Sequence, residues 1–185
     1  MKSAFRKTVV GAGLLLGISA GVQADDDLVQ QARQHSKQLA MQLQATLKKS
    51  IKSDGPQAAI QVCNTEAPAI AGQLSQGDWQ VGRTSLKWRN PDNQPDAWET
   101  QVMQQFAERL AAGEAPQTLE ASKTDNGEFR YMKAIPTAGV CLACHGEKLA
   151  PAIGTTLDKL YPQDRARGFK QGELRGAFTL RKTLK

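Results

Sequence analysis

Two cysteines and a histidine within five residues constrain this chain more than any other feature. Two residues separate Cys141 from Cys144, and His145 follows directly. Covalent attachment of haem requires two thiols at a fixed separation, one for each vinyl group, and an adjacent imidazole that reaches the iron from the anchored side. The spacing therefore predicts one haem c, attached through Cys141 and Cys144, with His145 as an axial ligand of the iron.

Three other sites can be built around a Cys-x-x-Cys pair. A thioredoxin-like dithiol is expected where the motif follows a strand and opens a helix, and its histidine would be incidental. A zinc site needs two further ligands, and only Cys63 and His35 are left to supply them. A structural disulfide gives His145 no role. Haem attachment is favoured because it uses all three residues.

The N-terminus has the features of an export signal. Lys2, Arg6 and Lys7 precede a short apolar run, and the sequence "VQA" then leads into three aspartates. This pattern predicts that residues 1–24 are a cleaved secretory signal peptide, with an uncleaved anchor as the alternative. Residues 25–185 would then form one c-type haem domain in the periplasm, with no membrane span in the mature chain.

The charge pattern argues against nucleic acid as a partner. The net charge of +6 includes three positive charges from the predicted signal peptide, and aromatic residues make up only 5% of the chain. The remaining lysines and arginines are dispersed and are not interleaved with aromatic side chains, as they would be in a nucleic-acid interface.

Hydrophobic periodicity predicts that the first half of the mature chain is mainly helical. Residues 25–53 carry an apolar stripe at helical spacing, which predicts a long N-terminal helix. Residues 55–77 are expected to form two short helices in tandem, because Pro56 and Pro68 each suit a first helical turn and Pro68 discourages the first helix from continuing. Cys63 would then point inward near the end of the first short helix.

The second half of the chain predicts a small antiparallel sheet. A strand starting near residue 78 would place Trp79, Val81, Arg83 and Ser85 on one face, and Asp96 is expected to cap the following helix. The sequence "DNG" predicts a hairpin that ends just before the cysteine motif. Residues 172–184 alternate as a closing strand does. Together these elements predict an α+β fold in which flanking helices surround the sheet.

The second axial ligand of the iron is not decided by the motif. The candidates are Cys63, His35, Met41, Met103 and Met132, or an open position. The methionines and His35 are equally explained as packing residues of helices and strands. Cys63 is the odd cysteine of a chain expected to enter an oxidising compartment, where an unpaired thiol is a liability unless it has another use.

Four segments carry a resemblance to a known family: "AAIQVCNTEAPAIA", "VGRTSLKWRNPDNQPDAWE", "VCLACHGEK" and "YPQDRARGFKQGELRGAFTL". In this order they resemble exported single-haem proteins with a PAS-like fold, a domain also found as the extracytoplasmic sensor of histidine kinases and chemotaxis receptors. The resemblance implies a c-type haem whose iron lies between the motif histidine and a distant cysteine thiolate. On this sequence those ligands are His145 and Cys63.

A haem with both axial positions filled by the protein is suited to electron transfer or to redox or gas sensing. A thiolate ligand stabilises ferric iron and lowers the reduction potential, and NO or CO would bind only where Cys63 gives way. The expected partners are a redox protein or a membrane sensor. Enzymatic activity is not the favoured interpretation, and a haem peroxidase or a thiol oxidoreductase using the Cys-x-x-Cys pair is the alternative.

The haem propionates also need cationic partners. Arg83, Lys87 and Arg89 alternate along one edge of "GRTSLKWRN" and could converge on a pair of carboxylates, although a solvated basic strand explains the same pattern. Trp79 and Tyr131 are candidates for pocket walls, and ordinary core positions are the simpler explanation.

Overall fold

The computed structural model describes residues 20–184, with side chains from residue 25 onward. The predicted signal peptide, residues 1–24, therefore lies outside the described residues except for the helical backbone of residues 20–24. Its cleavage stays a prediction. No helix within residues 20–184 is both long and apolar enough to cross a membrane.

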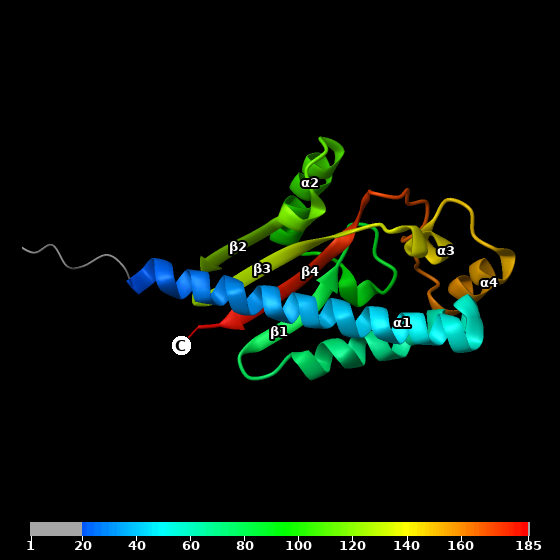
Figure 1. Ribbon diagram of the computed structural model, residues 1–185, viewed down its shortest axis with the longest axis horizontal. Coiled ribbons are helices and arrows are strands. Elements are labelled where there is room, and N and C mark those ends of the chain that lie inside the picture. The colour runs from blue at the N-terminus through cyan, green and yellow to red at the C-terminus, as the bar shows by residue number, and fades with distance from the viewer. Residues whose placement is uncertain (1–19, 185) are drawn as a thin grey trace, which may run out of the picture.

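The N-terminal element α1, Ala20–Leu74, is a helical hairpin. Gly55 has φ 82° and ψ 174°, a conformation that glycine adopts readily, and the chain reverses direction there. The long first arm and the shorter return arm run side by side along the sheet (Figure 1). Ala32 and Leu39 of the first arm and Ile70 and Leu74 of the return arm are buried in one core with strand residues.

The expectation of two tandem helices broken at Pro68 is wrong. The return arm continues through Pro68, which lies inside the helix, and the break lies at Gly55. A proline removes one backbone hydrogen bond. Here Ala67 and Ile70, on either side of Pro68, are buried, so tertiary packing supports the helix despite that loss. Cys63 consequently lies within a continuous helix rather than at a helix end.

Four antiparallel strands form the sheet in the order β1-β4-β3-β2. Asn126 and Gly127 have positive φ values of 50° and 74° and form the predicted hairpin turn between β2 and β3. β4 is the last strand of the chain but pairs with both β1 and β3, so it occupies a central position. The strands are β1 (Trp79–Thr84), β2 (Glu120–Asp125), β3 (Glu128–Pro136) and β4 (Leu174–Thr183).

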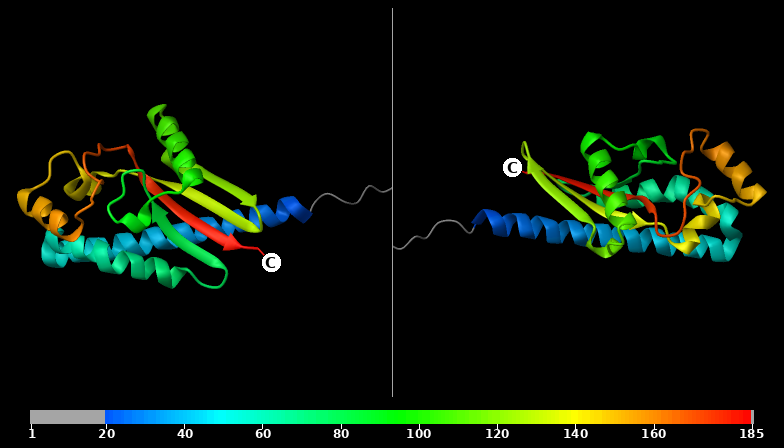
Figure 2. Two further views of the ribbon diagram at one scale, coloured as in Figure 1. Left: turned by 180° about the vertical axis from the view of Figure 1, so that it is seen from behind. Right: turned by 90° about the horizontal axis from the view of Figure 1, so that it is seen from above.

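Helix α2, Ala97–Ala111, packs on the sheet face opposite α1 (Figure 2). Asp96 caps α2 as predicted: its side chain accepts from the Glu99 N–H, while Glu99 accepts from the Asp96 N–H. Two 3₁₀ turns flank α2, η1 at Pro91–Asn93 and η2 at Pro116–Thr118.

The cysteine motif lies beyond one end of the sheet, among short helices. The 3₁₀ turn η3 (Gly139–Cys141) leads into α3 (Leu142–His145), and α4 (Pro151–Leu160) follows. These elements pack near the kink of α1 (Figure 1). The predicted α+β architecture, PAS-like with a long N-terminal helix and flanking helices, is confirmed.

Candidate functional site

The motif residues form one tight helical turn. Cys141 ends η3, Leu142–His145 is helical, and the Gly146 N–H donates to the Leu142 carbonyl at 2.9 Å. A Cβ at Gly146 would lie 2.6 Å from that carbonyl oxygen, so this position requires glycine. The turn places Cys141 and Cys144 three residues apart on one side, and neither forms a disulfide.

The His145 imidazole is held in one orientation. Its Nδ1 lies 2.8 Å from the Ala166 carbonyl oxygen, which can only accept, so Nδ1 carries the proton and Nε2 has the lone pair. Burial, together with the nearby Arg175 and Arg89 guanidinium groups, holds the pKa of His145 well below its ordinary value. A neutral imidazole anchored through Nδ1–H is the form in which histidine binds metals.

The segment 164–169 supports this orientation from the other side. The Phe169 N–H donates to the His145 carbonyl at 2.9 Å, and the Gly168 N–H donates to the Gly146 carbonyl at 3.1 Å. The Phe169 ring also meets the His145 ring edge-on, with 6.2 Å between centroids. The histidine is therefore positioned by backbone hydrogen bonds as well as by its own ring contacts.

Arg89 connects the motif to that segment. It is only 8% exposed, and its Nη2 donates to the carbonyl oxygens of Cys144 at 2.6 Å and Ala166 at 3.2 Å. Its Nε forms an ion pair with Asp164 at 3.1 Å. Its Nη1 lies 3.5 Å from His145 Nε2, so a metal bound at Nε2 would require the Arg89 Nη1 group to turn away.

The return arm of α1 brings Cys63 to the motif. Cys63 follows the buried Ala59 and Ile60 by about one helical turn, and Cys144 packs against the cluster that contains Ile60. Burial raises the pKa of the Cys63 thiol, while the positive charges of Arg83, Arg89 and Arg175 act in the opposite direction. The half-buried Cys63 thiol thus lies within the electrostatic influence of three guanidinium groups.

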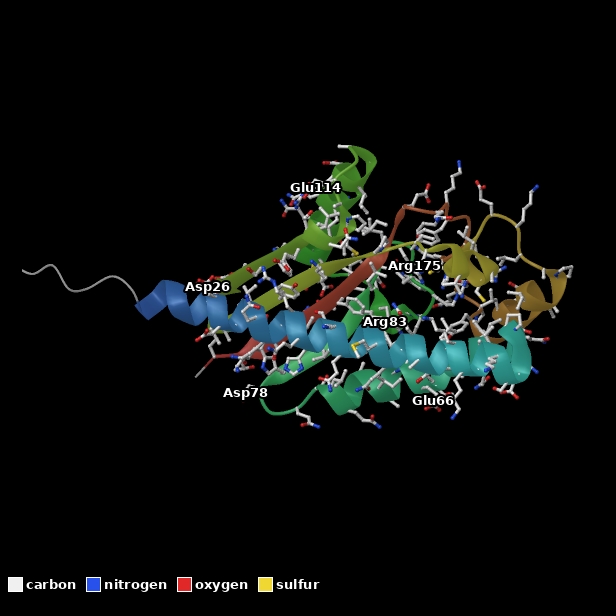
Figure 3. The ribbon with its side chains drawn as sticks, in the orientation of Figure 1. Asp26, Glu66, Asp78, Arg83, Glu114 and Arg175 are labelled. Atoms are coloured by element: carbon white, nitrogen blue, oxygen red, sulfur yellow. The ribbon has the colours of Figure 1, made fainter. Side chains whose placement is uncertain are left out.

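Among the described residues, two of these guanidinium groups have no carboxylate partner. The Arg83 side chain, on β1, forms no hydrogen bond or ion pair with any of them, and burial lowers its pKa. Arg175 donates to Ser85 Oγ at 3.0 Å and lies over the Phe169 ring at 5.1 Å. Burial and the nearby Arg89 and Arg83 lower the pKa of Arg175 to about 10. Figure 3 shows Arg83 and Arg175 near one another at the end of the sheet closest to α3.

Partly buried arginines without carboxylate partners favour an anion nearby, since withdrawing an unpaired charge from water is costly. Asp164 is already bound by Arg89 and by Arg167. The site therefore has an excess of positive charge next to Cys63 and His145. This arrangement is suited to a ligand that carries carboxylates and contains a metal.

Comparison with known proteins identifies the family. The model of the Tll0287-like family matches residues 23–182. The chain belongs to the Tll0287-like family. A solved structure, that of the cyanobacterial haem protein Tll0287, superposes with a TM-score of 0.59 at 25% sequence identity, over 89% of this chain and 97% of that one. A comparison with curated protein sequences gave no match. The resemblance described in the sequence analysis is thereby confirmed.

In this Tll0287-like chain the three predicted propionate partners have different surroundings. Arg83 is partly buried and has no carboxylate partner among the described residues, and Lys87 Nζ lies 4.4 Å from the centroid of the Phe169 ring. Arg89 is instead occupied by Asp164 and two carbonyl groups. Arg175 is a further cationic residue of the site, and it was not predicted from the sequence.

The irregular backbone of β4 explains why Arg175 was missed. The register of β3 with β4 shifts between Ile135 and Pro136, whose partners are Gly176 and Leu174, so Arg175 is an extra residue on its strand. Such a bulge breaks the alternation of side chains and redirects the extra residue. A regular strand would have placed Arg175 on the α2 face together with Ala177.

The other candidate axial ligands lie away from the site. His35 packs on Trp79, with 5.1 Å between ring centroids, and Trp79 begins β1 at the end far from Arg83. Met103 and Met132 are fully buried between α2 and the sheet, and Met41 is 60% exposed on α1. Of these candidates, Cys63 alone has an electrostatic influence on the motif, through Cys144.

Two further expectations can be compared with this Tll0287-like structure. Trp79 and Tyr131 are buried in the core under α1 and do not line the site. Within residues 25–184, no group of three or more histidine, cysteine, aspartate or glutamate side chains is placed to hold a metal ion, and the zinc alternative lacks His35 in particular.

A hollow among the described residues lies beside the site rather than in it. It measures about 570 Å³ and is bordered by Lys87, Phe169 and the α2 residues Ala107 and Leu110. Neither Cys63 nor His145 lines it. Arg89 Nη1 lies in front of the His145 imidazole, 3.5 Å from Nε2.

Proposed function

We propose that this chain is a periplasmic mono-haem c-type protein that works in electron transfer or in redox or gas sensing. Membership of the Tll0287-like family and the similarity to a solved haem protein support haem binding. The observation that carries the proposal is the orientation of His145: its Nδ1–H is anchored to the Ala166 carbonyl, directly after the Cys141/Cys144 pair.

The residues of the site fit the haem group. Cys141 and Cys144 would form the two thioether bonds, His145 Nε2 would be one axial ligand, and Cys63 Sγ the other. Arg83 and Arg175 offer guanidinium groups without carboxylate partners for the propionates, and Lys87 lies nearby. When bound, the haem supplies a one-electron couple, and a thiolate ligand would lower its potential.

Filled axial positions favour electron transfer or sensing over peroxidase chemistry, because a peroxidase needs an open position at the iron. The partners would be a redox protein or a membrane receptor, and in a gas sensor NO or CO would replace Cys63. A thiol oxidoreductase is disfavoured by Cys144. Burial raises the pKa of its thiol, whereas a reactive thiol needs a lowered pKa.

Absorption and EPR spectra of the exported protein test the proposal. The parental protein should be red, with haem that stays attached on denaturation, and its ferric spectrum should indicate thiolate ligation. Cys63→Ala should change that spectrum, and Met41→Ala, at an exposed position on the same element, should leave it unchanged. A His/Met-type spectrum that is the same in Cys63→Ala would refute thiolate ligation.

Two further results would refute broader parts of the proposal. A colourless protein with a reactive Cys141/Cys144 thiol pair would favour the oxidoreductase alternative, and rapid turnover of peroxide would indicate an open iron position. N-terminal sequencing of protein from the periplasmic fraction should give a chain that begins at Asp25. Recovery of the protein with residues 1–24 still attached would contradict a cleaved signal peptide.

A further inference from the structure

A second hollow, of about 280 Å³, lies between the first arm of α1 and the sheet, away from Cys63 and His145. Its wall is mostly apolar and includes Ala40 of α1, Pro116 of η2, Pro136 of β3 and Phe178 of β4. The first arm of α1 runs along this face of the sheet (Figure 2). We call this hollow the α1 pocket.

Ser36 is the unusual residue of the α1 pocket. It contributes to the lining, its exposed fraction is 3%, and its Oγ has no hydrogen-bond partner among the described residues. A buried hydroxyl without a partner is unfavourable, and such groups in proteins normally bind something. The Ser36 side chain therefore borders the pocket while its hydroxyl lacks a hydrogen-bond partner among the described residues.

The charged residues around the α1 pocket indicate the sign of the charge that its ligand carries. Arg33, Lys37 and Lys133 all contribute to the lining. Glu120 forms ion pairs with Arg33 and Lys133. Lys37 has no ion pair within the described part of the chain, and the surroundings keep an excess of positive charge.

We propose that the α1 pocket binds a small amphipathic carboxylate. Its apolar body would lie against Ala40, Pro116 and Phe178, and its carboxylate would accept from the Ser36 hydroxyl and face the Lys37 ammonium group. The volume is below the range of typical drug-sized sites, which selects a short aliphatic or aromatic acid. This site is separate from the proposed haem site and does not depend on it.

Calorimetric titration of the full haem-loaded protein with octanoate tests the proposal. Octanoate should bind once per chain, and Ala40→Phe, which fills the pocket, should weaken binding by about tenfold or more. Ala45→Phe is the matched control, because Ala45 lies on the same helix but is exposed. Absence of octanoate binding, or equal binding by Ala40→Phe and the parental protein, would overturn the proposal.

Two substitutions and a second probe test the polar contacts. Ser36→Ala should raise the thermal midpoint of the ligand-free protein, because it removes an unpaired hydroxyl, and should weaken octanoate binding by about tenfold. Lys37→Gln should weaken it by about threefold, the effect of one exposed ion pair. Octanol, which has the same chain length without the charge, should bind more weakly than octanoate. Equal affinities for octanol and octanoate, or unchanged affinity in Ser36→Ala, would refute recognition of a carboxylate.

Discussion

Replacing Arg89 by methionine should destabilise the protein far more than the loss of an ordinary surface charge. The Arg89 and Asp164 side chains are only 9% and 2% exposed. Arg89 also donates to the carbonyl oxygens of Cys144 and Ala166, the residues on either side of the imidazole site. Arg89→Met keeps most of the side-chain volume and removes the charge together with all of these hydrogen bonds.

The expected loss of stability follows from the Asp164 carboxylate, which remains buried when Arg89 is replaced. Removing one partner of a buried ion pair typically costs about 3–5 kcal/mol, because the other charge is left without compensation. Asp164 keeps a second partner, since Arg167 Nε lies 2.8 Å from its other carboxylate oxygen. We therefore expect the free energy of unfolding to fall by about 3 kcal/mol, the lower end of that range.

Urea unfolding followed by circular dichroism measures this change. Arg109→Met is the control, because it removes the same kind of side chain from an ion pair with Glu114 whose partners are 43% and 36% exposed. Such exposed pairs contribute about 0–1 kcal/mol. The reasoning is refuted if Arg89→Met costs no more than Arg109→Met.

The pH dependence of the same pair gives an independent check. Burial alone would raise the pKa of Asp164, but the hydrogen bonds from Arg167 and Arg89 hold it below its ordinary value. A carboxyl group whose pKa is lowered by folding stabilises the protein above its unfolded pKa and loses that contribution as the pH falls. The difference in stability between the parental protein and Arg89→Met should therefore shrink below about pH 4.

Two further predictions concern other positions. Gly146→Ala should lower both stability and haem incorporation, because the new Cβ would lie 2.6 Å from the Leu142 carbonyl oxygen. The control, Gly154→Ala, lies in open space on α4 and should be neutral or stabilising. A stable Gly146→Ala protein that is fully loaded with haem would contradict the close contact. The hydrogen bond from Arg33 lowers the pKa of Glu120 to about 2, so its contribution to stability should be complete above about pH 4.3 and be lost as the pH falls toward 2. Glu120→Gln should flatten the acid limb of a stability–pH curve, and an unchanged limb would exclude this role.

Local signals in the sequence predicted the fold well. The turn at Asn126 and Gly127 and the cap at Asp96 depend on residues within a few positions of one another, and both are present. Breaks were expected both near Gly55 and at Pro68, because glycine and proline are local breakers. Only the break at Gly55 is present, because the packing that supports the return arm through Pro68 is not visible in sequence.

Only part of the candidate site could be predicted, because some of its residues meet through contacts between distant segments. The motif residues Cys141, Cys144 and His145 are contiguous, so their chemistry could be inferred directly from their spacing. Arg175 reaches the site through a bulge in β4, and Arg89 pairs with Asp164 across a long stretch of chain. Both features depend on contacts between distant segments, to which periodicity is insensitive.

The central position of β4 has a consequence for the order in which this molecule can assemble. β1 and β3 are joined only through β4, and β4 is the last strand of the chain. A chain that emerges N-terminus first therefore exposes the motif at residues 141–145 before its sheet can close. Non-local strand pairing of this kind is slow to form. The motif residues are therefore already synthesised while β1 and β3 still lack the strand that joins them.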